Sequence, residues 1–175
     1  MATRPKRNHS DSGSVLILGL GNILLKDEGI GVHIAEELQK QDLPASVEVI
    51  DGGTAGLDIL LPQKGLDKLV VIDALRAGKK PGTIYKARFR GSEKEKLTQI
   101  FGQGGESKIS LHQVGLIDAL GAAEKTGRAP EEVVIIGIEP AEWNCGLELT
   151  EPVRESIPQI IKKVLEEIED AVHRE

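Results

Sequence analysis

One stretch decides the fold: GLGNILLKDEGIG, residues 19–31. It follows an apolar run, residues 14–20, that is short and rich in aliphatic side chains, as buried strands are. It precedes Ile30, Ile34 and Leu38, whose i, i+4, i+8 spacing is typical of the inner face of a helix. A strand, a glycine-rich turn and a helix in this order predict an α/β sheet, in which ligands bind at the carboxyl ends of the strands.

The turn carries two adjacent acids, Asp27 and Glu28. A dinucleotide-binding turn would need a third glycine where Leu24 stands, and a phosphate would be repelled by the two acids. Nucleotide binding is therefore disfavoured. Glu28 could instead only complement the helix dipole, a role worth about 0.3–1 kcal/mol, and the turn alone leaves this alternative open.

The rest of the chain alternates strands with helices. Four further strands are predicted at residues 47–51, 68–73, 83–89 and 133–138. A short helix is expected at residues 57–61, and a longer one begins at Ser110, whose spacing to Gln113 matches a capping box. The buried stripe of this longer helix is predicted to be Val114, Ile117, Leu120 and Ala123. A last helix opens at Thr150, and Pro158 either bends it or marks its true start.

This alternation predicts a three-layer α/β/α sandwich with a mostly parallel, twisted sheet of roughly five strands. The strand at residues 83–89 follows its predecessor without a helix between them, so it should run antiparallel in that neighbourhood. Residues 14–175 are expected to form a single α/β domain. Residues 1–13 are polar and are expected to be a disordered tail.

Composition excludes several classes of function. The 175 residues carry a net charge of −6 and only 2% aromatic residues, a poor match for nucleic acid or for an anionic membrane. No apolar run is long enough for membrane insertion, and the basic residues before the first strand do not form a signal peptide, so a cytoplasmic location is expected. Cys145 is the only cysteine, and its acidic neighbours Glu142 and Glu148 argue against a catalytic thiol.

Three side chains are expected to meet at the carboxyl edge of the sheet: Glu28, Asp73 and His112. Asp73 ends a buried strand, although such an acid can also merely cap a turn. His112 falls in the first turn of a helix, where the dipole favours the neutral imidazole that a metal needs, although a surface histidine is the alternative. His33 is interpreted as a packing residue. Two carboxylates and one imidazole form an incomplete ligand set for a divalent transition metal.

Four motifs in this order closely resemble the hydrogenase maturation endopeptidases. They occupy residues 18–31, 51–56, 71–74 and 110–116, and Gly137-Ile138-Glu139-Pro140 is also similar to that family. The resemblance extends over residues 14–170, while the basic tail lies outside it.

The resemblance implies a hydrolase that removes a short C-terminal extension from the large-subunit precursor of a nickel–iron hydrogenase after nickel insertion. It implies metal contacts from Glu28, Asp73 and His112, with the nickel contributed by the substrate and serving as the recognition signal. Another divalent metal could occupy the site of the isolated protein. No nucleophile is assigned, and Glu28 and Asp73 are the candidate catalytic groups of an aspartyl-type or metal-dependent endopeptidase.

A second group of residues is expected to orient ligands or substrate. Its members are Asn22, Asp27, Asp51, Gly52, Gly53 and Thr54. The expected partner is the hydrogenase large-subunit precursor, and the protease itself is expected to be a monomer. The alternative function is a nickel-binding maturation chaperone that docks the precursor without cutting it, and processing of a precursor separates the two.

Overall fold

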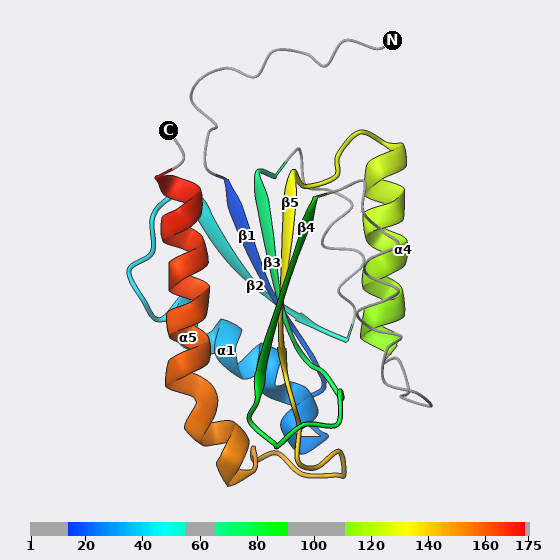
Figure 1. Ribbon diagram of the computed structural model, residues 1–175, viewed down its shortest axis with the longest axis vertical. Helices are drawn as coiled ribbons and strands as arrows, with labels where there is room; N and C mark the ends of the chain where they lie inside the picture. The colour runs from blue at the N-terminus through cyan, green and yellow to red at the C-terminus, as the bar shows by residue number, and fades with distance from the viewer. Residues whose placement is uncertain (1–13, 55–65, 91–110, 174–175) are drawn as a thin grey trace.

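The structure, a computed structural model, describes residues 14–54, 66–90 and 111–173, with the side chains of 111–114 excepted. Five strands form one sheet in the order β2-β1-β3-β5-β4. They are β1 (Val15–Leu20), β2 (Val47–Gly53), β3 (Lys68–Ala74), β4 (Ile84–Arg90) and β5 (Glu132–Ile138). Figure 1 shows the sheet with the carboxyl ends of its parallel strands at the lower end of the view.

The pairing confirms the predicted mixed sheet. β1 runs parallel to both β2 and β3, and β3 runs parallel to β5. β4 forms the antiparallel edge, as its short connection to β3 predicts, and it pairs with β5 rather than with β3. The three central strands are buried along their whole length, which explains their nearly continuous apolar sequences.

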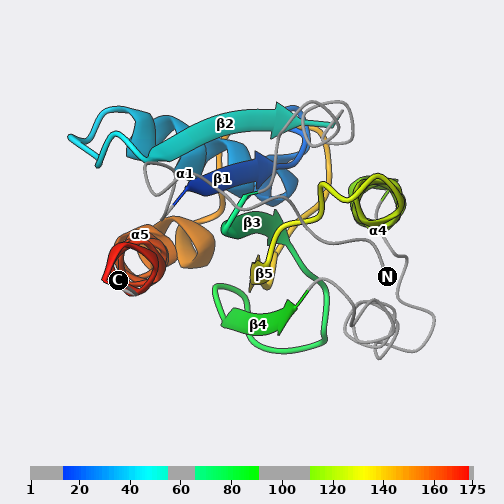
Figure 2. The same cartoon turned by 90° about the horizontal axis from the view of Figure 1, so that it is seen from above.

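Helices cover both faces of the sheet, so the predicted three-layer sandwich is confirmed (Figure 2). α1 (Ile30–Gln39) and α5 (Glu151–Val172) lie on one face, and α4 (Leu111–Lys125) lies on the other. Successive residues of β1 point alternately to the two sides. Val15 and Ile17 pack in the core beneath α1 and α5, whereas Leu16, Leu18 and Leu20 pack in the core beneath α4.

The helices correct two details of the prediction. The buried face of α4 consists of Leu116, Ala119, Leu120 and Ala123, whereas Ile117 is only half-buried. Leu120 and Ala123 are therefore buried as predicted, and Ile117 packs against the same core although it is half-exposed. The prediction missed Leu116 and Ala119, and the side chain of Val114 lies outside the described residues. α5 begins at Glu151 and contains Pro158 in its interior, so Pro158 does not mark the start of the helix.

Several expectations lie outside the described residues. They concern the tail at 1–13, the helix at 57–61 and the cap at Ser110. Among the helices of the described ranges, none is long and apolar enough to cross a membrane.

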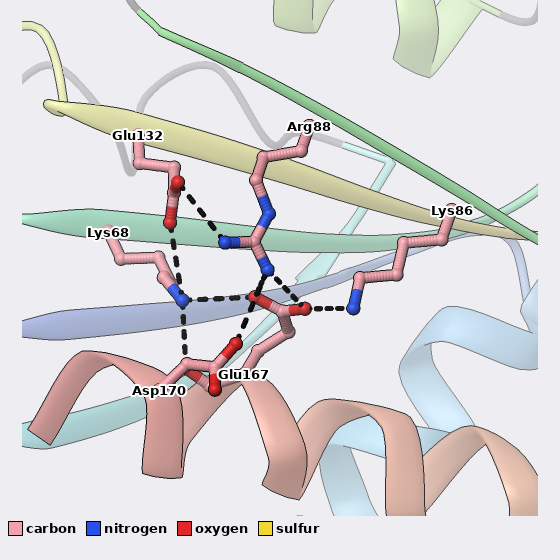
Figure 3. A network of polar contacts seen from close by, with 6 residues as sticks. All are labelled: Lys68, Lys86, Arg88, Glu132, Glu167 and Asp170. Carbon is pink, nitrogen blue, oxygen red and sulfur yellow. Dashed lines mark hydrogen bonds and ion pairs between the residues drawn. The ribbon is translucent and has the colours of Figure 1, made fainter. Parts of the chain in front are cut away.

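A network of buried charges closes the amino edge of the sheet (Figure 3). Lys68, the first residue of β3, donates to the Glu167 carboxylate of α5 at 2.9 Å and lies 3.3 Å from the carboxylate of Glu132. Arg88 of β4 donates to Glu167 at 2.8 Å, and Lys86 of the same strand also pairs with it. We call this the amino-edge network: Lys68, Lys86, Arg88, Glu132, Glu167 and Asp170.

Candidate active site

The loops that follow β1, β3 and β5 converge at the carboxyl edge of the sheet. A short 3-10 helix, η1 (Lys26–Gly29), follows β1 and packs against β3. The β3–β4 connection and the loop at 139–150 lie at the same end, where α4 also begins (Figure 1). Because β1, β3 and β5 are adjacent and parallel, their loops are neighbours, as the general rule for ligand sites in such sheets requires.

Two glycines let the first turn of α1 rest directly on the strand ends. A Cβ added at Gly31 would lie 2.2 Å from the carbonyl oxygens of both Leu20 and Ile72, and one at Gly19 would lie 2.1 Å from the carbonyl oxygen of Gly31. No side chain larger than hydrogen fits at such distances. Since Ile72 immediately precedes Asp73, this packing brings the Glu28 turn to the end of β3 where Asp73 lies.

Glu28 has the chemistry of an unfilled ligand. It is half-buried, and its Oε2 atom is buried without a hydrogen-bond partner among the described residues. A buried carboxylate oxygen is costly unless a proton donor or a cation faces it. This atom therefore favours a bound group at the edge over a purely dipole-complementing role for Glu28.

Asp73 lies at the end of β3 and is only 3% exposed, so it is deeper than the rim position that the sequence suggested. Its Oδ1 accepts a hydrogen bond of 2.9 Å from the amide of Ala74. This bond goes to the adjacent residue within β3 and not to the turn that follows, so it is not the turn cap considered from the sequence. One oxygen used by a local amide is compatible with a ligand role for the carboxylate, because each oxygen has two lone pairs.

His112 lies in the first turn of α4, as predicted, and its side chain is outside the described part of the structure. Among the side chains that the structure describes, no group of three or more His, Cys, Asp or Glu could hold a metal ion. That set contains Glu28 and Asp73 and lacks His112, so the three-residue metal site stays a prediction. The donor types themselves, two carboxylates and an imidazole, fit a divalent transition metal.

Asp27 fastens the loop after β5 to the Glu28 turn. Its fully buried carboxylate accepts four hydrogen bonds: from the amides of Ala141 at 2.8 Å, Glu142 at 3.0 Å and Thr150 at 2.8 Å, and from the Thr150 hydroxyl at 2.8 Å. This set of partners leaves no exposed oxygen for substrate. It fits an orienting role, in which Asp27 holds its neighbour Glu28 and the loop in one arrangement.

The remaining second-group residues line the same edge. Asn22 Oδ1 accepts from the amide of Leu24 at 3.0 Å, and Asp51 Oδ1 accepts from the amide of Gly53 at 2.8 Å. Gly53 has a φ of +46°, and its carbonyl accepts from the amide of Gly21, which ties the end of β2 to the end of β1. Gly52 is buried, and Thr54 is exposed.

Glu139 also lies at the carboxyl edge of the sheet, and the sequence had suggested no role for it. This buried acid follows β5 and accepts hydrogen bonds from the amides of Ala77 at 2.9 Å and Gly78 at 3.2 Å. It also accepts from the hydroxyl of Tyr85, and burial together with this carboxylate raises the pKa of Tyr85. The signal was present, because Glu139 ends a buried parallel strand just as Asp73 does.

The loop at 139–150 carries the aromatic and sulfur groups of this edge. The guanidinium of Arg76 lies 4.0 Å above the ring of Trp143, which joins the loops after β3 and β5. Cys145 is exposed and forms no disulfide. His33 is half-buried in α1, with Nδ1 3.9 Å from the Glu36 carboxylate.

Comparison with known proteins identifies the family. Residues 32–167 match the family model HycI, described as hydrogenase maturation protease. The hydrogenase 2 maturation protease of Escherichia coli is 39% identical over 153 residues, 86% of this chain and 88% of the relative. The HupD hydrogenase expression/formation protein of Bradyrhizobium diazoefficiens is 38% identical over 85% of this chain and 74% of its own length.

Solved structures agree with this assignment. The hydrogenase maturating endopeptidase HybD from E. coli superposes with a TM-score of 0.78 at 37% identity, covering 89% of this chain and 92% of that one. A hydrogenase 2 maturation peptidase from Thaumarchaeota archaeon SCGC_AB-539-E09 gives a TM-score of 0.67 at 30% identity, covering 88% and 97%. The chain therefore belongs to the hydrogenase maturation protease family and is an endopeptidase of that family.

Proposed function

We propose that this protein removes the C-terminal extension of a nickel–iron hydrogenase large-subunit precursor after nickel insertion. Glu28, Asp73 and His112 would contact the nickel that the precursor carries, so that the metal serves as the recognition signal. The observation that carries this proposal is the buried Oε2 atom of Glu28, which has no hydrogen-bond partner among the described residues and lies on the turn that packs against β3. A cation on the substrate would satisfy that atom.

The ligand set explains why the metal should come with the substrate. Two carboxylates and one imidazole, without a thiolate, are a sparse set that should hold nickel weakly in the free protease. Binding also requires a neutral imidazole, so affinity should fall as the pH falls. A precursor that already holds nickel through cysteine thiolates would present open or exchangeable positions, and the three side chains would then gain affinity for the assembled centre alone.

The roles of the chain's own groups follow from their positions. Asp27 holds the Glu28 turn and the 139–150 loop together, while the strand end fixes Asp73. Glu28 and Asp73 are the candidate catalytic groups, and the proposal assigns no serine or cysteine nucleophile. We place the reaction in the cytoplasm, because the single cysteine demands no oxidising compartment. The proposal takes the protease as a monomer.

The test is to incubate the purified protein with nickel-loaded large-subunit precursor and to follow the precursor mass. We expect a discrete loss of mass with the wild-type protein, and a loss of both metal retention and processing with Glu28→Gln, Asp73→Asn and His112→Ala. Processing like that of the wild type by any two of these variants would remove the site assignment. Tight binding of the precursor without any loss of mass would instead favour a docking chaperone.

A further inference from the structure

Three large apolar side chains are exposed among the described residues, and all three lie at the carboxyl edge. They are Ile23, 42% exposed, Leu24, 60% exposed, and Leu147, 64% exposed. We call these three residues the apolar crest. Scattered exposed leucines need no explanation, but here every such residue of the described chain gathers beside one turn, which is the pattern of an interaction surface.

The crest is held in a fixed shape by backbone hydrogen bonds. The amide of Gly146 donates to the carbonyl of Leu24 at 3.0 Å, and the amide of Lys26 donates to the carbonyl of Gly146 at 2.9 Å. This isolated bridge places Leu147 next to the Leu24 turn, although the two leucines are far apart in sequence. The four hydrogen bonds of Asp27 anchor the same loop from below. A preorganised surface loses little entropy when a partner binds.

The charges beside the crest select the kind of partner. Lys26 pairs with Glu142, which compensates this basic group, while the exposed Glu148 beside Leu147 keeps the surroundings of the crest acidic. Such a patch disfavours an acidic peptide, and the net charge of −6 disfavours an anionic membrane. An uncharged apolar segment of a protein is the partner that this surface fits.

The crest is continuous with the candidate active site. Leu24 precedes Glu28 on the same turn, and the turn between them contains Asp27. A partner that presents a metal to Glu28 therefore passes over Ile23 and Leu24. Nothing in the fold requires these side chains to be apolar, since the buried core closes without them.

We infer that the apolar crest docks an uncharged apolar segment of the large-subunit precursor beside its metal centre. This inference rests on the proposed function, because it names the surface that binds the same substrate, the large-subunit precursor. The crest supplies affinity that does not depend on the metal, whereas Glu28, Asp73 and His112 supply affinity that does.

The test compares two double variants of similar size. Leu24→Gln with Leu147→Gln makes the crest polar, and Leu24→Met with Leu147→Met keeps it apolar as the matched control. We expect the glutamine pair to raise the KM for nickel-loaded precursor about tenfold or more with kcat nearly unchanged, and the methionine pair to stay close to wild type. Both pairs should unfold like the wild type, because the sites are exposed.

Binding to nickel-free precursor separates the inference from the proposed function. The glutamine pair should weaken this binding too, because the crest needs no metal. Equal affinity of the two double variants for the precursor would overturn the inference, even if cleavage is confirmed. Crest-dependent binding without cleavage would contradict the proposed protease while the docking surface survives. A wild-type dimer that only the glutamine pair dissociates, at unchanged precursor affinity, would assign the crest to self-association and also overturn the inference.

Discussion

The amino and carboxyl edges of the sheet differ in how their buried acidic side chains are paired. At the amino edge, the amino-edge network pairs each buried acid with a base: Lys68, 2% exposed, lies between Glu132 and the fully buried Glu167. At the carboxyl edge, the buried Oε2 atom of Glu28 has no hydrogen-bond partner among the described residues, and the Asp27 carboxylate accepts hydrogen bonds from backbone amides. The acids of the amino edge are thus paired within the chain, whereas the carboxyl edge carries a buried oxygen for which the described residues supply no hydrogen-bond partner.

The largest effect on stability should come from the amino-edge network. Glu167→Gln removes the charge that faces Lys68, Lys86 and Arg88, and it should lower the free energy of unfolding by about 3–5 kcal/mol, because the buried Lys68 then keeps only Glu132 and the two partly exposed bases of β4 lose their buried acid. Chemical denaturation measures this change. The matched control is the exposed neighbour Glu166→Gln, which should stay within about 0.5 kcal/mol of wild type. Equal effects of the two variants would contradict the contrast between the edges.

A smaller effect is expected at Asp27. Asp27→Asn replaces a carboxylate that accepts four hydrogen bonds with an amide that can satisfy only part of them, and it should cost about 1.5–3 kcal/mol of unfolding free energy. The exposed Asp118→Asn serves as the control. Because Asp27 also holds the 139–150 loop, its variant should process precursor more slowly at a temperature where it is fully folded. Unchanged stability and processing would show that the hydrogen bonds between Asp27 and the 139–150 loop are not needed.

The pH dependence of stability should also originate at the amino edge. Burial alone would raise the pKa of Glu167, but Lys86, Lys68 and Arg88 outweigh it and lower the pKa below the ordinary value of 4.5. A lowered folded-state pKa gives stability that is present above pH 4.5 and is lost as the pH falls through the folded-state value. Denaturation between pH 7 and pH 3 should show this loss in the wild type and a shallower slope in Glu167→Gln. Parallel slopes would count against the assignment.

The smallest change in stability is expected at the candidate site. Glu28→Gln should alter the unfolding free energy by about 1 kcal/mol or less, because the Oε2 atom of Glu28 has no hydrogen-bond partner among the described residues. The same variant should nevertheless lose precursor processing. A loss of stability as large as that of Glu167→Gln would identify Glu28 as a structural residue and remove the contrast between the two edges.

The sequence predicted the parts of the fold that depend on local pattern. Ile30, Ile34 and Leu38 are buried as their spacing indicated, and the apolar runs became the three buried parallel strands. In α4 the predicted stripe was right at Leu120 and Ala123 but missed Leu116 and Ala119, because apolar residues on several sides of this helix fit more than one stripe. Local periodicity therefore identifies an element, but it does not always identify the face that is buried.

The long-range contacts could not be predicted from one sequence. Asp27 and its partners in the 139–150 loop are more than a hundred residues apart, with separations of 114 to 123 residues, and nothing in their local sequences relates them. Nothing in the local sequence marks Lys68 and Glu167 as buried, yet both are buried where the start of β3 meets the end of α5. Glu139 could have been found, since acids at the ends of buried parallel strands meet at one edge.

We propose that cleavage requires nickel in the substrate, because the side chains at the carboxyl edge recognise the precursor through this metal. The most direct measurement compares nickel-loaded and nickel-free precursor as substrates of metal-stripped protease, with cleavage followed by mass spectrometry. We expect cleavage of the loaded precursor only, with no rescue of the empty precursor when the protease alone is preloaded with nickel. Equal cleavage of the two precursors would contradict recognition through the metal and would rule out substrate nickel as the partner of Glu28.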